Sequence, residues 1–234
     1  MDVLIENRSE ILVAFGRTAE MALMAGVMAL VIGFFLAALR VSPIALAQFF
    51  GASYVNIVRN TPLLLIMFIF VFGLPELGIG PELNLNDVFG IDDPVRLLNF
   101  SVFYIFATTA LGLYTAAFIC EAVRSGINSI AVGQAEAARS VGMTFSQTLT
   151  EVVLPQAFRA VIPPVASTLI AMTKNTTVAL AVGVTEATFL MKKLTEDNAT
   201  ALFTIFIAFA VGYMILVGII AGVASILERK LKVA

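Results

Sequence analysis

Five apolar segments of about 20 residues or more run through this chain of 234 residues and limit the folds that it can adopt. A helix needs about 20 apolar residues to cross the hydrocarbon core of a bilayer, and in lipid its backbone groups must bond to one another. The segments lie at about 19–39, 54–74, 97–119, 156–183 and 201–227. We therefore predict an all-α integral membrane protein with five transmembrane helices in a single transmembrane domain, residues 1–234.

The composition supports a membrane protein and argues against a catalytic one. Hydrophobic residues make up 60% of the chain and charged residues 13%, about half the charged fraction of an average soluble domain. The sequence has no His and a single Cys, which excludes Ser-His-Asp triads, Cys-His pairs and His-rich metal sites. A net charge of −2 lacks the basic footprint of nucleic-acid binding. We expect no catalytic residue, no metal site and no nucleic-acid partner.

Basic residues predict how the segments are oriented. Arg229, Lys230 and Lys232 follow the last segment, and Lys and Arg accumulate on the cytoplasmic side of membrane proteins. The carboxyl terminus is therefore expected in the cytoplasm, and an odd number of spans puts the amino terminus outside. The link at 40–59 and the insert at 120–155 should then both be cytoplasmic.

The insert predicts a pair of short helices. Before Gly142, apolar residues recur at three- and four-residue steps, which is typical of an amphipathic helix. Gly142 suits a sharp turn because glycine adopts positive φ without a steric penalty. Thr144 or Ser146 is suited to cap a second short helix. Pro155 is expected to mark the boundary with the fourth apolar segment.

Two interpretations of this insert remain open on its residues alone. It can lie on the membrane surface, or it can dock into a groove of another protein. Surface-lying helices usually carry many Lys or Arg residues, whereas this insert mixes Glu136 with Arg139, which favours docking. These two residues can form an ion pair with each other, which would stabilise the helix by about 0.2–0.5 kcal/mol, or they can pair with charges of the partner. Ala137 and Ala138 are small enough to allow a close approach.

Polar residues inside the fourth segment indicate a substrate pathway. Lys174 costs several kcal/mol in lipid unless it is paired or hydrated, so it either faces a pathway or another subunit, or extends to the outer interface. Asn175, Thr176 and Thr177 add donors and acceptors that suit an amino acid. A positive charge beside them favours an anionic substrate.

Other residues leave alternatives open. Pro163 and Pro164 remove backbone donors and should bend the fourth segment, either as part of a substrate site or as a packing kink. Glu121 and Arg124 can form a pair three residues apart or contact an opposite subunit. Arg59 is interpreted as a cytoplasmic anchor, with substrate contact as the alternative.

Short motifs carry a resemblance to a known family. They are RNTPLL at 59–64, RSGIN at 124–128, GQAEAARS at 133–140, LPQA at 154–157 and TKNTT at 173–177. Together they resemble, over most of residues 15–230, the permease subunits of bacterial ABC importers of the polar amino acid family (histidine, glutamate, glutamine, arginine and opine). Asn60 departs from the family's usual Gly. The combination looks most like the first permease subunit of actinobacterial glutamate importers.

The resemblance implies a type I ABC importer permease fold with cytoplasmic coupling (EAA) helices that dock on a partner ATPase. The residues that it assigns to coupling are Glu136, Ala137, Ala138, Arg139, Gly142, Leu154 and Pro155. The candidates for the substrate pathway are Lys174, Asn175, Thr176, Thr177, Glu121 and Arg59.

The resemblance also implies partners: a second permease subunit in a heterodimer, two copies of an ATPase that binds ATP and Mg, and an extracytoplasmic amino-acid-binding protein. The setting is a bacterial cell membrane. This chain has no GxxxxGK[ST] phosphate loop, so no cofactor is expected on it. The expected substrate is L-glutamate, with glutamine, aspartate, arginine or histidine as alternatives. An ion-coupled secondary transporter is the rival class, but the sequence shows no convincing sodium site or inverted repeat.

Overall fold

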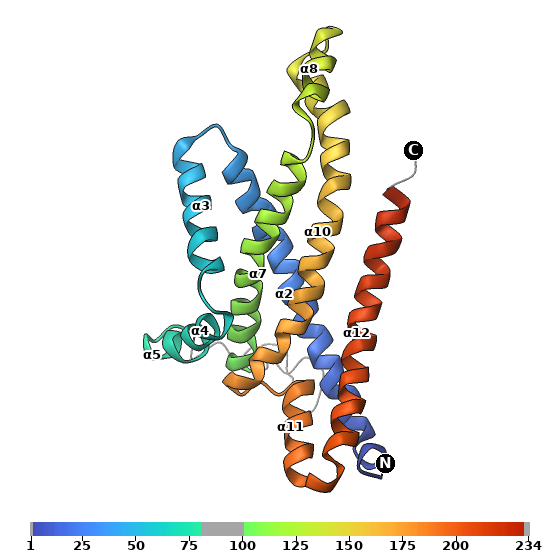
Figure 1. Ribbon diagram of the computed structural model, residues 1–234. Coiled ribbons are helices and arrows are strands. Elements are labelled where there is room, and N and C mark those ends of the chain that lie inside the picture. The colour runs from blue at the N-terminus through green and yellow to red at the C-terminus, as the bar shows by residue number, and fades with distance from the viewer. Residues whose placement is uncertain (1, 81–100, 232–234) are drawn as a thin grey trace, which may run out of the picture.

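The computed structural model describes residues 2–80 and 101–231, and every regular element in these ranges is helical. The long helices run roughly side by side (Figure 1), as the sequence predicts. They are α2 (Arg8–Val41), α3 (Ala45–Arg59), α7 (Val102–Asn128), α10 (Leu154–Asn175) and α12 (Leu202–Leu231). Short helices join them: α1 (Asp2–Glu6), α4 (Leu63–Phe68), η1 (Ile69–Gly73), α5 (Leu74–Glu76), α8 (Val132–Ser140), α9 (Phe145–Gln147), η2 (Thr148–Val153), η3 (Thr176–Val182), α11 (Ala187–Asp197) and η4 (Ala199–Ala201).

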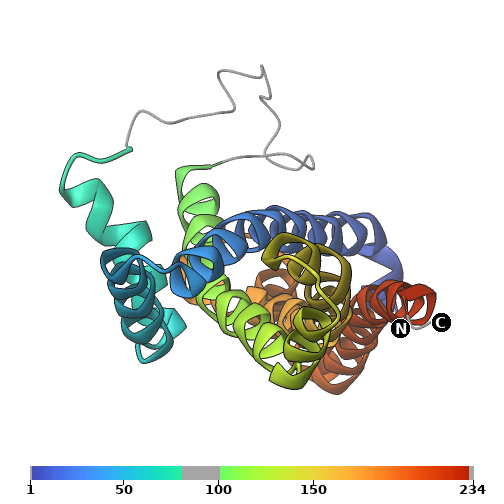
Figure 2. The ribbon, with the colours of Figure 1, turned by 90° about the horizontal axis from the view of Figure 1, so that it is seen from above.

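Helices α2 and α7 form the centre of the bundle, and α10 packs against α7. Small residues allow this close packing, as is usual between helices in lipid. At Gly126 of α7, an added Cβ atom would lie 2.9 Å from the backbone nitrogen of Val161. Figure 2 shows α3 and α12 on opposite sides of the central helices. Helix α7 ends at Asn128 rather than near residue 119, so Glu121 and Arg124 lie on a long helix and not in a loop.

The second apolar segment is bent, in contrast to the single segment predicted at 54–74. Its helical path starts earlier, at Ala45, and α3 and the stretch Leu63–Glu76 meet at an angle of 102°. The cause is local. Pro62 is extended (φ −58°, ψ 135°), and the proline ring disfavours the helical conformation for the residue before it, Thr61. In the described ranges, four helices are long and apolar enough to span a membrane, and this bent pair can form a fifth span.

The prolines of the insert and the fourth segment do not interrupt the helical structure. Helix α10 begins at Leu154, close to the boundary predicted at Pro155, but helical structure also continues before it. Helical structure is continuous from Phe145 to Val182, through Pro155 and through the Pro163-Pro164 pair. Pro155 follows η2, a π-helical turn with wider hydrogen bonding. Such a turn lacks the ordinary i to i−4 bond that a proline ring obstructs. The fourth segment therefore projects beyond its predicted boundary, toward α8.

The two ends of the bundle are built differently. Helix α8 lies at one end, at the top of Figure 1, while the amino terminus and α11 lie at the other. Around α11, Leu190 and Leu194 pack with Ile205 and Phe209 of α12 and with Ala14 of α2 in a buried apolar cluster. The candidate functional residues divide between these two ends and the groove between α7 and α10.

Candidate functional site

The end of the bundle at α8 carries an exposed tip, residues 132–147. The turn expected at Gly142 is present, with φ at +90°. The expected cap is also present: Thr144 accepts from the Gln147 backbone nitrogen, and the Gln147 side chain accepts from the Thr144 backbone in return. Such a capping box satisfies amides that the start of a helix otherwise leaves without partners. The turn and the cap thus give the tip a defined shape.

The tip turns apolar side chains outward. Val132, Val141 and Phe145 are 73%, 80% and 67% exposed, although they lie within a short and otherwise polar stretch. The two alanines predicted to allow close approach differ, because Ala138 is buried and Ala137 is exposed. Exposed apolar residues that gather on one small element are typical of a surface for another protein.

The charged residues of the tip do not form the pair considered from sequence. Among the ion pairs of the described residues, none joins Glu136 to Arg139. The Arg139 guanidinium instead lies 5.7 Å from the centre of the Phe145 ring. Both Glu136 and Arg139 are exposed. Leu154 lies apart from the tip, where it lines an apolar groove with Val41, and Pro155 next to it is exposed.

A small polar groove of about 280 Å³ lies between α7 and α10. Asn175 lines it, together with Ser167 and Thr168 of α10 and Tyr114 and Phe118 of α7. The Thr168 hydroxyl donates to a carbonyl of its own helix, which leaves oxygen lone pairs to accept from a ligand. Of the four polar residues predicted at 174–177, Asn175 is the one that this groove includes.

The other three residues of this stretch are placed differently. Lys174 is exposed. Thr176 is buried and donates to the carbonyl of Thr173, while Thr177 donates to the carbonyl of Lys174, both at 2.8 Å. Their hydroxyl protons therefore serve the turn where α10 becomes η3. Their oxygens keep lone pairs that can accept, so the role of both threonines in the substrate pathway stays a prediction.

Three arginines surround Glu121. Arg40 at the end of α2 forms a hydrogen-bonded ion pair with one carboxylate oxygen, and Arg124 bonds to the other at 2.9 Å. Arg59, at the end of α3, lies 3.8 Å from Glu121 and also 5.4 Å from the centre of the Phe118 ring. The pair Glu121–Arg124 was predicted, whereas Arg40 was not. Arg59 thereby connects this cluster, the arginine cluster, with a ring that lines the polar groove.

A buried carboxylate, Glu186, was not predicted from the sequence. It is 1% exposed and caps α11 by accepting from the backbone nitrogen of Phe189 at 3.1 Å. The hydroxyls of Thr18 in α2 and Tyr213 in α12 donate to its other oxygen, at 3.2 and 2.8 Å. Burial raises the pKa of Glu186 above its usual value, and these hydrogen bonds oppose that rise. We call these four residues the Glu186 cluster.

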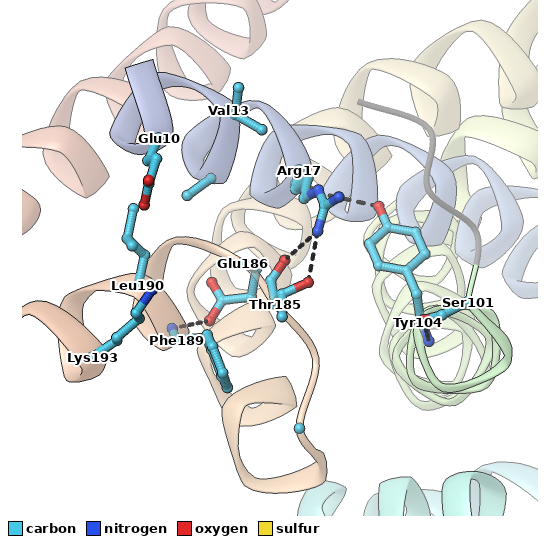
Figure 3. Close-up of a pocket in the computed structure, with 12 residues that line it drawn as sticks. Glu10, Val13, Arg17, Ser101, Tyr104, Thr185, Glu186, Phe189, Leu190 and Lys193 are labelled. Atoms are coloured by element: carbon cyan, nitrogen blue, oxygen red, sulfur yellow. Dashed lines mark hydrogen bonds between the residues drawn. The ribbon is translucent and has the colours of Figure 1, made fainter. Parts of the chain in front are cut away.

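A cavity of about 510 Å³ opens beside this cluster (Figure 3). Arg17 of α2 is buried and donates to the Thr185 hydroxyl at 2.6 Å, and the Tyr104 hydroxyl donates to the carbonyl of Arg17 at 3.3 Å. Glu10 and Lys193 also line the cavity, and both are exposed. No group of three or more possible metal ligands occurs among the described residues.

Membrane-length helices, a polar groove between two of them and an exposed apolar tip are features expected of a membrane transport component. A family model described as binding-protein-dependent transport system inner membrane component matches residues 18–233. The chain belongs to this family. It is therefore a multi-pass protein of the inner membrane that works with a binding protein.

Individual relatives match nearly the whole chain. The glutamate transport system permease protein GluC of Corynebacterium efficiens is 42% identical over 207 residues, which are 88% of this chain and 87% of the relative. The probable glutamine ABC transporter permease protein GlnM of Bacillus subtilis is 34% identical over 234 residues, 99% of this chain and 98% of the relative. The glutamate/aspartate import permease protein GltJ of Escherichia coli is 31% identical over 218 residues, 93% and 85% of the two chains.

Solved structures share the fold. The crystal structure of an amino acid ABC transporter with histidines superposes with a TM-score of 0.80 at 23% identity, covering 97% of this chain and 96% of that one. An inward-facing methionine ABC transporter, MetNI, gives 0.68 at 22% identity, covering 95% and 96%. The predicted ABC importer permease fold is confirmed.

Proposed function

We propose that this chain is the permease subunit of an ABC importer that carries L-glutamate into the cytoplasm by alternating access. The observation that carries the proposal is the 42% identity to a glutamate permease protein over 88% of the chain. The names of the other relatives favour the same class of substrate or its amide, glutamine. Arginine and histidine remain less favoured alternatives.

The energy comes from a partner ATPase that binds ATP and Mg and docks on the tip. Exposed Val132, Val141 and Phe145 are the apolar contacts that an ATPase groove would bury. The turn at Gly142 and the Thr144 cap fix the shape of the tip, so that closure of two ATPase copies moves α10 as a rigid lever. With the tip in the cytoplasm, the carboxyl terminus is inside and the amino terminus is outside.

The substrate passes along the groove that Asn175 lines. Its neighbours Tyr114 and Thr168 supply hydroxyl groups for the ammonium and carboxylate groups of an amino acid. Lys174 and the nearby arginine cluster add positive charge, which favours an acidic side chain. A second permease subunit, in a heterodimer, covers this groove and completes the pathway.

Uptake in cells tests the proposal. Labelled L-glutamate at low concentration is offered to cells with and without this gene, in a strain that lacks redundant carriers, with aspartate, glutamine, arginine and histidine as competitors. We expect the deletion to lose uptake, and we expect unlabelled glutamate to compete best. Unchanged glutamate uptake in the deletion would remove glutamate as the substrate. If the deletion instead loses uptake of one of the competitors, that amino acid is the substrate.

A further inference from the structure

The cavity beside the Glu186 cluster has charged residues at its mouth, and the polar groups on its floor are already hydrogen-bonded. Glu10 of α2 and Lys193 of α11 stand at the mouth, and both side chains are exposed (Figure 3). On the floor of the cavity, the Glu186 carboxylate accepts from three donors and Arg17 donates to Thr185. The charges that remain accessible to a partner therefore lie at the mouth, on two different helices and with opposite signs.

The frame that holds these two charges is rigid. The Glu186 cluster joins the loop before α11 to α2 and α12, and Leu190 and Leu194 anchor α11 in a buried apolar cluster. Glu10 and Lys193 are thus displayed from elements whose relative positions are fixed by buried contacts. Charges displayed on a fixed frame orient a partner with less loss of conformational entropy.

The location of the cavity selects the kind of partner. Its lining comes from the first turns of α2, the start of α7, and α11 with the loop before it. The cavity therefore lies at the end of the bundle opposite the tip, where Figure 1 shows the amino terminus and α11. In the orientation proposed above, this end faces the extracytoplasmic side. Exposed charges of both signs are unsuited to lipid. Because the polar groups on the floor are already hydrogen-bonded, the cavity offers few groups that could bind a free amino acid. Paired opposite charges on a rim match the polar rim of a transient protein interface.

We propose that this charged mouth docks the extracytoplasmic binding protein, with an acidic side chain of the partner at Lys193 and a basic one at Glu10. The proposal rests on the proposed function, because it needs the importer orientation. The family itself depends on a binding protein, and the mouth assigns a place to that contact. The two opposite charges set the register of docking, since a partner turned by half a rotation would meet like charges.

The test uses the assembled transporter, with its ATPase and second permease, in lipid nanodiscs. The rate of ATP hydrolysis is measured against the concentration of the glutamate-loaded binding protein that stimulates the wild-type complex. Lys193→Glu and Glu10→Lys are compared with Lys193→Arg. The matched control is Lys192→Glu on the same helix, because Lys192 is exposed but pairs with Glu196 at 3.7 Å and does not line the cavity.

We expect each reversal at the mouth to raise the half-maximal concentration of binding protein roughly threefold to tenfold, with the same rate at saturation. The shift should shrink at high ionic strength, which a purely structural defect would not do. Lys193→Arg and Lys192→Glu should remain within about twofold of wild type. Equal shifts for Lys192→Glu and Lys193→Glu would overturn the proposal, as would stimulation by free glutamate without any binding protein. A wild-type complex that no binding protein stimulates would instead refute the proposed function.

Discussion

The two ends of the bundle use apolar and charged residues in opposite ways. At the tip, Val132, Val141 and Phe145 point outward, and only Ala138 of α8 is buried. At the other end, Ala187, Leu190 and Leu194 of α11 point inward, and even the carboxylate of Glu186 is buried. One end therefore leaves apolar side chains uncovered, whereas the other buries its apolar side chains and exposes charges. The same contrast separates the half-exposed arginine cluster from the Glu186 cluster.

The comparison predicts that changes at the tip affect transport and that changes at the Glu186 cluster affect stability. The strongest test is Gly142→Val, because a β-branched residue at φ +90° is strained although its Cβ meets nothing within 4 Å. We expect ATP-driven uptake to fall more than about tenfold while the protein still inserts into the membrane. Gly133→Val is the matched control, since Gly133 has equally open surroundings on the same tip but lies in helix α8. Equal uptake in the two variants would contradict a role for the turn.

Glu186→Ala should instead lower the stability of the fold. It leaves the Thr18 and Tyr213 hydroxyls and the Phe189 amide without their shared acceptor, which costs about 3 kcal/mol of unfolding free energy. Unfolding can be followed by a thiol-reactive dye, because Cys120 is the single cysteine and is buried. Exposed Glu196 pairs with Lys192 and provides the control, for which Glu196→Ala should cost below about 0.5 kcal/mol. Similar unfolding temperatures for the two variants would break the comparison.

Glu121→Gln should cost less, about 1–2 kcal/mol, because its partners are partly exposed and solvent screens them. Its signature is a dependence on salt. Without the carboxylate, the guanidinium groups of Arg40, Arg59 and Arg124 repel one another, so high ionic strength should restore part of the lost stability. The same dye assay at low and high salt checks this. A loss that is independent of salt would mean that the arginine cluster resembles the Glu186 cluster after all.

Thr144→Ala should give the smallest change. It removes the side-chain acceptor of the capping box and should cost about 1 kcal/mol of local helix stability. Because the tip is exposed, we expect this loss to increase amide hydrogen exchange at residues 145–147 without lowering the unfolding temperature of the bundle. Thr150→Ser serves as a control, since Thr150 donates only to the carbonyl of Ser146 and serine keeps that hydroxyl. A lower bundle unfolding temperature for Thr144→Ala would show that the tip is not independent.

Local patterns predicted the features that depend on neighbouring residues. The apolar segments, the turn at Gly142 and the cap at Thr144 all follow from residues within a few positions of one another. The bend at Pro62 had a local signal, but the apolar run around it concealed the break. Conversely, the Pro163-Pro164 pair and Pro155 do not interrupt the helix, and Pro155 follows a π-helical turn, which its local sequence did not indicate.

The clusters of charged residues could not be assembled from the sequence alone. Arg40 and Glu121 are 81 positions apart, and Thr18 and Glu186 are 168 apart. Their contacts depend on how α2 packs against α7 and α11, which periodicity does not specify. Glu186 did carry one local signal, since it stands before an amphipathic stretch as a helix-capping residue does. Its burial and its partners, however, required the fold.

The central claim is that this chain translocates L-glutamate in an ATP-driven complex. Its most direct test is uptake of labelled L-glutamate into proteoliposomes that contain the purified complex, with the binding protein outside and ATP inside, without any ion gradient. We predict accumulation with ATP and none with a non-hydrolysable ATP analogue, and we predict that Gly142→Val complexes fail to accumulate glutamate. Accumulation driven by a sodium or proton gradient in the absence of ATP would contradict the account and favour a secondary transporter.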